Sequence, residues 1–246
     1  IISKCMLLKQ QIRKISGGVW YFHMDYKFIS NTRVFKGLTE EETKSALKCL
    51  KAYIKEYNKG DVIYHSGSVV DAIGLVVSGG VNIEQNDVWG NVSILDNIGA
   101  GRVFAEAYVC AKKAILMIDV VAAEPSKILF LNMNNIAETC DNSCPFYMKI
   151  VQNMLSIMAE KNLNLSRKIS HTTPKSIRDR LLSYLSYQAA VQGRNQFEIP
   201  FNRLQLANYL CVDRSALSNE LGKMKRDGLI SYEKNKFSLL NQINEL

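Results

Sequence analysis

The residues best suited to chemistry are four polar side chains near the C-terminus. Arg214, Ser215, Ser218 and Asn219 are spaced so that they share one face of a helix. An arginine fork pairs with the acceptors of guanine and an asparagine amide pairs with adenine, each contributing about 1 to 3 kcal/mol of discrimination between bases. The chemistry expected here is noncovalent reading of base edges. For one such helix in isolation, an ordinary solvated polar face is the alternative.

Apolar spacing predicts the two helices that must position these side chains. Asp213 is placed to cap the second helix, whose inner face is expected to carry Leu217, Leu221 and Met224. A tight turn at 211–213 separates it from a shorter helix. The small Ala207 in the shorter helix allows two steeply crossing helices to approach. The inner face of the shorter helix is expected to consist of Leu206, Ala207 and Leu210.

A hairpin is predicted directly after the second helix. Asp227-Gly228 should end the helix, and the apolar segments 229–232 and 237–240 flank a polar tip at 234–236. A hairpin in this place is the wing of a winged helix-turn-helix. Basic side chains around it are expected to meet phosphate groups. These candidate phosphate contacts are Lys223, Lys225, Lys234 and Lys236.

A coiled-coil pattern predicts a long helix over residues 145–170. Its apolar seam is broken by one amide, Asn162, which at such a position fixes register and favours two strands. The pattern therefore predicts a homodimer, and packing of the helix only within its own subunit is the alternative. The seam consists of Val151, Leu155, Met158, Asn162, Leu165 and Ile169.

Residues 60–135 read as many short strands separated by glycines, which is typical of a roll or sandwich. Before them, a Thr39 cap and apolar residues at Ala46, Leu47, Leu50 and Ile54 predict an amphipathic helix from about 39 to 57. The strands are expected at 61–64, 73–77, 81–83, 115–121 and 128–131.

Composition narrows the function classes. The formal charge of +8 and pI of about 9.1 make an anionic partner such as nucleic acid reasonable. No apolar run reaches membrane-span length, and six scattered cysteines suit a reduced, cytoplasmic protein. No phosphate-binding loop or nucleophile motif indicates an enzyme, and no metal site is expected. A thiol switch at Cys140 and Cys144 stays open beside two ordinary buried thiols.

These patterns predict four segments. Residues 1–23, where Gly17-Gly18 interrupts a basic stretch, are expected to be a non-native or disordered leader, with Met24 as the native start. An effector-sensing β-roll at 24–144, a dimerisation helix at 145–170 and a winged helix DNA-binding domain at 171–246 should follow.

From about Phe35 to Leu240 the chain resembles the cyclic-AMP receptor and fumarate-nitrate regulator (CRP/FNR) family. The resemblance rests on the order and spacing of several short motifs, among them Lys59-Gly60-Asp61-Val62-Ile63, Ser78-Gly79-Gly80-Val81, Phe104-Ala105-Glu106, Thr173-Pro174 and Gly228-Leu229-Ile230. Ala105 and Cys211 stand where glycine is common in the family.

The resemblance implies an α+β protein with an N-terminal double-stranded β-helix (a cupin-like β-roll), a long dimerisation helix and a C-terminal winged helix-turn-helix. It also implies a homodimer on two-fold symmetric double-stranded DNA. By position, Arg214, Ser215 and Asn219 correspond to the base-contacting residues of the family. RNA polymerase and a small-molecule effector are further candidate partners.

The effector expected from the resemblance differs from cyclic AMP. Nucleotide-binding members hold the cyclic phosphate with a Glu and an Arg-Ser pair ten residues later, but here Glu106 is followed by Leu116-Met117. Apolar side chains cannot neutralise a buried phosphate. A small apolar or aromatic effector and an effector-independent regulator remain open. The candidate pocket residues are Val103, Phe104, Glu106, Leu116, Met117, Lys161 and Asn162.

The sequence thus predicts an effector-responsive, sequence-specific transcription regulator that acts as a homodimer. The alternative is a sensing module that controls a protein partner without binding DNA. Steep loss of DNA affinity with rising salt would distinguish the two, because counterions are released when phosphates are neutralised.

Overall fold

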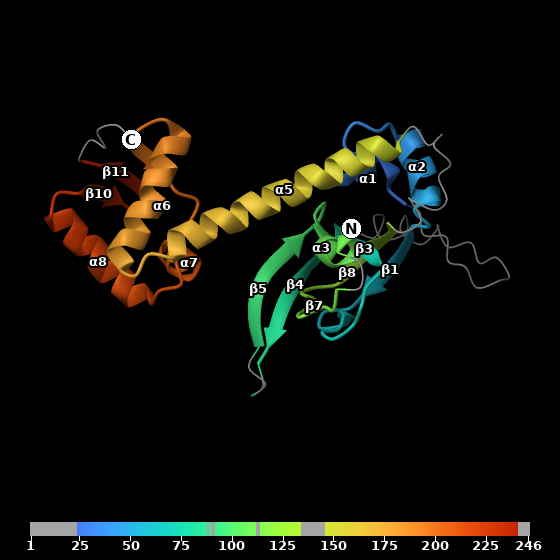
Figure 1. The fold of residues 1–246 in the computed structure, drawn as a ribbon, viewed down its shortest axis with the longest axis horizontal. Coiled ribbons are helices and arrows are strands. Elements are labelled where there is room, and N and C mark those ends of the chain that lie inside the picture. Colours follow the sequence, from blue (N-terminus) through green and yellow to red (C-terminus); the bar gives the residue numbers. More distant parts are fainter. Residues whose placement is uncertain (1–23, 88, 90–91, 112–113, 134–145, 241–246) are drawn as a thin grey trace, which may run out of the picture. The chain divides into compact units, whose positions relative to one another are not determined.

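The computed structural model describes residues 24–87, 89, 92–111, 114–133 and 146–240. The chain divides between Met158 and Ala159 into two compact units (Figure 1). The expectations for the leader at 1–23 and for Cys140 and Cys144 fall outside the described residues. No helix in the described part of the chain combines the length and apolar character needed to span a membrane.

The first described helices of the N-terminal unit are α1 (Tyr26–Ser30), η1 (Arg33–Phe35) and α2 (Glu40–Cys49). A capping box begins α2, because Thr39 accepts from the Glu42 amide and the Glu42 carboxylate accepts from the Thr39 amide. The predicted helix from 39 to 57 is wrong beyond Cys49. Lys51 has a φ of 46°, which ends the helix, and Ile54 pairs with Leu129 in a sheet.

Two antiparallel four-stranded sheets form the β-roll, with strand orders β1-β8-β3-β6 and β2-β7-β4-β5. Side chains from both sheets fill the core between them. The predicted strand at 115–121 is shorter in the structure, and Ile115 forms only an isolated bridge with Val69. The strands are β1 (Tyr53–Tyr57), β2 (Val62–Tyr64), β3 (Ala72–Ser78), β4 (Gly80–Asn86), β5 (Val92–Gly99), β6 (Val103–Phe104), β7 (Asp119–Ala122) and β8 (Ser126–Asn132), with the short helix α3 (Glu106–Cys110) after β6.

The long helix α5 runs from Tyr147 to Thr172, so its first turns belong to the N-terminal unit and its last turns to the C-terminal unit. One side of its N-terminal half packs into the roll unit through Ile150, Met154 and Ile157. The amide of Asn153 donates to the carbonyls of Val34 and Lys36, both at 2.9 Å. These contacts fix the first half of α5 on the N-terminal helices.

In the described part of the C-terminal unit, three helices and a small sheet follow α5. Ser176 caps the start of the helix after α5, because its hydroxyl accepts from the Asp179 amide. With the roll and the long helix, this unit confirms the expected α+β fold class. Its elements are α6 (Ile177–Gln192), β9 (Gln196–Glu198), α7 (Arg203–Tyr209), α8 (Arg214–Arg226), β10 (Ile230–Glu233) and β11 (Lys236–Leu239), with sheet order β10-β11-β9.

Candidate nucleic-acid interface

Helix α8 is fixed at its start and along its inner face. The Asp213 carboxylate accepts from the amides of Ser215 at 2.7 Å and Ala216 at 3.2 Å, which confirms the predicted cap. Hydrogen bonds from the Ser215 hydroxyl and from these amides hold the pKa of Asp213 below its usual value. Leu217, Leu221 and Met224 are fully buried, as predicted for the inner face.

The outer face of α8 carries the four predicted base-reading residues, and Arg214, Ser215, Ser218 and Asn219 are all exposed. The Ser215 hydroxyl donates to the Asp213 carboxylate, and the Ser218 hydroxyl donates to the Arg214 carbonyl at 2.9 Å. Both serines therefore use their only hydroxyl proton within the helix. Arg214 and Asn219 present a guanidinium and an amide to solvent.

The turn between α7 and α8 keeps its left-handed conformation without glycine. Cys211 has a φ of 54°, in the region that glycine adopts most readily. The Arg180 guanidinium on α6 donates to the carbonyls of Leu210 at 3.1 Å and Cys211 at 3.2 Å. Cys211, which stands where glycine is common in the CRP/FNR family, thus keeps the turn conformation of a helix-turn-helix.

An ion-pair network attaches α8 to α6. The Arg178 guanidinium lies 2.6 Å from the Glu220 carboxylate and 2.7 Å from the Asp227 carboxylate. Lys223 lies 3.7 Å from the same Glu220. These contacts orient the second half of α8 while its N-terminal turn stays exposed.

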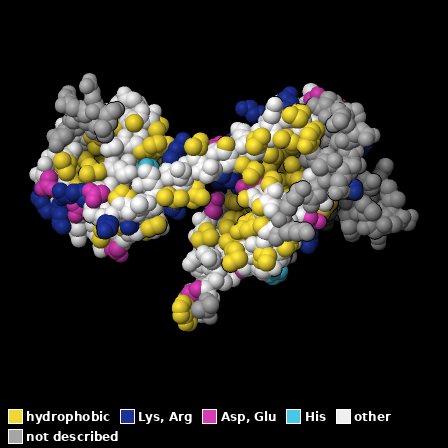
Figure 2. Space-filling model, viewed as in Figure 1, with side chains coloured by type: hydrophobic (Ala, Val, Ile, Leu, Met, Phe, Trp, Pro, Cys, Tyr) yellow, Lys and Arg dark blue, Asp and Glu magenta, His cyan; other side chains and the backbone are white. Residues whose placement is uncertain are grey.

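The four predicted phosphate-contacting lysines are exposed on α8 and on the wing formed by β10 and β11. The Lys225 ammonium lies 5.5 Å from the ring centre of Tyr232, so the last turn of α8 contacts the wing. Lys234 occupies the wing turn with a φ of 52°. Figure 2 shows Lys and Arg side chains gathered over the region of α8. The four are Lys223, Lys225, Lys234 and Lys236.

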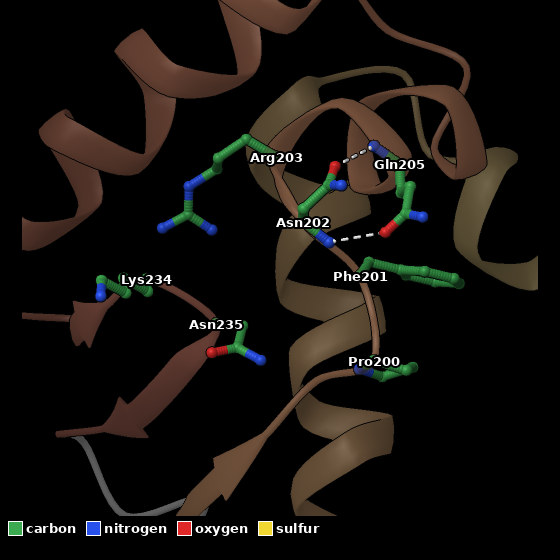
Figure 3. Close-up of a pocket in the computed structure, with 7 residues that line it drawn as sticks. All are labelled: Pro200, Phe201, Asn202, Arg203, Gln205, Lys234 and Asn235. Carbon is green, nitrogen blue, oxygen red and sulfur yellow. Dashed lines mark hydrogen bonds between the residues drawn. The ribbon is translucent and has the colours of Figure 1, made fainter.

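A hollow of about 440 Å³ lies between the start of α7 and the wing turn. Arg203, which the sequence reasoning missed, lines it together with Lys234 (Figure 3). The Arg203 guanidinium lies 4.7 Å from the ring centre of Tyr232 and 5.1 Å from that of Phe237, and burial lowers its pKa. Two aromatic residues in the predicted wing were the signal that could have indicated a stacked arginine.

The predicted effector-pocket residues fall into two groups. Val103, Phe104 and Leu116 are buried, and the first two belong to hydrophobic core clusters. The Phe104 ring packs so closely on Gly74 that a Cβ there would lie 2.0 Å from the ring. Met117, by contrast, is 68% exposed.

The polar candidates of the pocket lie in different surroundings. Glu106 is buried at the start of α3, directly after Ala105, which has a φ of 63°. Lys161 and Asn162 lie on α5 within the C-terminal unit, half-buried and exposed respectively. Among the described residues, no three His, Cys, Asp or Glu side chains come together as a metal site.

The predicted dimer seam lies largely on the open side of α5. Leu155 is 62% exposed and Leu165 is 58% exposed, while Val151 and Met158 are half-buried. This side is distinct from the face of Ile150, Met154 and Ile157 that packs within the chain.

Comparison with known proteins agrees with this geometry. A model of the cyclic nucleotide-binding domain matches residues 54–143, and a model of the Crp-like helix-turn-helix domain matches residues 179–243. No curated protein matches the chain in sequence.

Solved structures share the fold at low sequence identity. The chain is similar to CprK in complex with OCPA, at 16% identity and a TM-score of 0.54, covering 82% of this chain and 92% of that one. It is also similar to the c-di-GMP-responsive global regulator CLP of Xanthomonas campestris, at 15% identity and a TM-score of 0.50, covering 81% of this chain and all (100%) of that one.

A cyclic nucleotide-binding type of β-roll followed by a winged helix-turn-helix defines a DNA-binding transcription regulator rather than an enzyme. The chain belongs to the CRP/FNR family.

Proposed function

We propose that this regulator binds a specific, two-fold symmetric DNA site as a homodimer. The observation that carries the proposal is the exposed polar face of α8, which is backed by the fully buried Leu217, Leu221 and Met224 and flanked by a basic wing. In this arrangement Arg214 and Asn219 read base edges in the major groove. The lysines of α8 and the wing bind phosphates and set the register on the duplex.

The apolar residues on the open side of α5 support the homodimer. Leu155 and Leu165 lie exposed at heptad-related positions, where a second copy of α5 would cover them. Pairing through α5 would relate two α8 helices by a two-fold axis. The half-sites would then lie about 34 Å apart, one turn of the double helix.

The β-roll is proposed to bind no cyclic AMP. Leu116 is fully buried at the position where nucleotide-binding members carry the arginine for the phosphate, and Met117 follows it. The burial of Val103 and Phe104 in the core favours an effector-independent roll over one with a wide apolar pocket. Isothermal titration calorimetry is expected to show no binding heat when cyclic AMP is added to the protein. Cyclic AMP is also expected to leave the affinity for DNA unchanged.

Selection of bound sites from random double-stranded DNA tests the proposal. The expected result is an inverted repeat whose half-site centres lie about ten base pairs apart, bound with an affinity that falls steeply as salt rises. If no sequence is enriched and retention on DNA does not depend on salt, the result would instead favour a module that controls a protein partner. Repeating the selection with cell extract tests for an effector.

A further inference from the structure

The end of α5 is embedded in a cluster of aromatic rings around His171. This side chain is 3% exposed although it is titratable. Its ring centre lies 5.5 Å from that of Tyr184, 5.2 Å from that of Tyr187 and 5.9 Å from that of Tyr209. Because the first two tyrosines belong to α6 and the third to α7, one residue of α5 contacts both helices that precede α8.

One hydrogen bond connects the end of α5 to the helix-turn-helix. The Nδ1 atom of His171 lies 2.9 Å from the hydroxyl of Tyr209, the last residue of α7. The Tyr184 hydroxyl in the same cluster is buried without a hydrogen-bond partner among the described residues. A buried hydroxyl that lacks a partner lowers the stability of a packed arrangement. The packed arrangement of the cluster is therefore less stable than it would be if the Tyr184 hydroxyl were hydrogen-bonded.

A proton on His171 would be poorly accommodated. Burial, and then the charge of Arg167 on α5, lower the pKa of His171 from its ordinary value of 6.5. The Arg167 guanidinium lies 5.5 Å from the Tyr187 ring centre, so it is part of the same cluster. Burial raises the pKa of Tyr184 and of Tyr209, which face His171 from α6 and α7.

The direction of the pH effect follows from this. The packed arrangement binds fewer protons than the opened one, so its stability is complete above pH 6.5, the ordinary value, and falls as the pH drops below it. At lower pH the protonated imidazolium favours an arrangement in which water reaches it.

We propose that His171 is a positioning residue that makes the reading of DNA sensitive to acid. When neutral, it fixes α6 and α7 on the end of α5; when protonated, it releases them, so that α8 loses its fixed orientation. The proposal rests on the proposed DNA-binding function. Apparent affinity falls with the fraction of molecules that hold the packed arrangement.

The affinity of the full-length protein for its selected DNA site, measured from pH 5.5 to 8 at constant ionic strength, tests the proposal. Wild-type affinity is expected to be about threefold to tenfold weaker at the acid end. His171→Gln, which cannot be protonated in this range, should give a flat profile. The matched control His65→Gln removes an exposed histidine and should keep the wild-type profile. A His171→Gln profile as steep as that of wild type would overturn the proposal.

A measurement without DNA separates this inference from the proposed function. The chain has only three histidines, His23, His65 and His171, so their ring signals can be followed by NMR during a pH titration. His171 should titrate below its ordinary value of 6.5, and amide signals of α7 should move with the same midpoint. If His171 titrates at or above 6.5, or if α7 does not respond, the inference fails whether or not the protein binds DNA.

Discussion

Helix α8 and the strands around β6 place their polar and apolar side chains in opposite ways. On α8 the polar candidates are exposed to solvent, while the apolar face is buried against the rest of the unit. The buried face holds the helix in place and so determines which side chains a partner can reach. Around β6 the candidates Val103 and Phe104 are themselves the core. Exposed side chains on α8 can therefore be substituted without disturbing the core. A substitution at Val103 or Phe104, in contrast, also changes the packing between the two sheets.

The largest effect is expected on dimer formation. Leu155→Glu leaves the monomer fold unchanged because the side chain is already 62% exposed, but in the proposed dimer it buries an unpaired carboxylate, which costs several kcal/mol. Sedimentation should show monomers. Ser156→Glu, exposed one position along the helix, is the matched control and should stay dimeric. If Leu155→Glu remains dimeric, the predicted seam is not part of the dimer interface.

Phe104→Ala tests whether the roll is filled by its own side chains. The ring is 1% exposed and packs on Gly74, so the substitution should lower the free energy of unfolding by about 3 to 5 kcal/mol. Denaturant unfolding measures the change. Met117→Ala, at an exposed position, should change it by less than about 0.5 kcal/mol. A small loss for Phe104→Ala would point to an open pocket beside the ring.

Arg214→Ala tests the other side of the comparison. We expect specific DNA binding to weaken by about 1 to 3 kcal/mol with little change in affinity for random DNA, because a base contact is lost and the charge contribution to backbone binding is minor. Lys223→Ala serves as the phosphate-contact control and should weaken both kinds of binding and reduce the salt slope. Equal losses of specific and random binding in Arg214→Ala would contradict base reading.

The smallest effects are expected at two left-handed positions, one in each unit. Ala105 has a φ of 63° and Cys211 a φ of 54°, so Ala105→Gly and Cys211→Gly should each stabilise the protein by about 0.5 to 1 kcal/mol. Gly228→Ala, at a φ of 71° with open space around the added Cβ, should have the opposite sign. Thermal unfolding compares all three variants, and destabilisation by either glycine would show that the side chain it removes contributes packing.

The same contrast explains what could be predicted from the sequence. The periodicity of α8 and its Asp213 cap are local signals, and the structure confirms the cap and the buried face. Ile54 continued the apolar spacing of α2 only by coincidence, because its position is decided by pairing with Leu129, which lies far along the chain. The stacking of Arg203 on the wing and the burial of His171 likewise depend on contacts between distant segments.

The internal hydrogen bonds of Ser215 and Ser218 limit how much sequence information α8 can extract. Their hydroxyl protons are directed to Asp213 and to the Arg214 carbonyl, so toward a base each oxygen can only accept, from the amino group of adenine or cytosine. Discrimination should therefore concentrate under Arg214 and Asn219. The preferred sites would form a gapped motif, with a few strongly constrained base pairs in each half and tolerant positions between them, and would be numerous in a genome unless dimer symmetry restricts them.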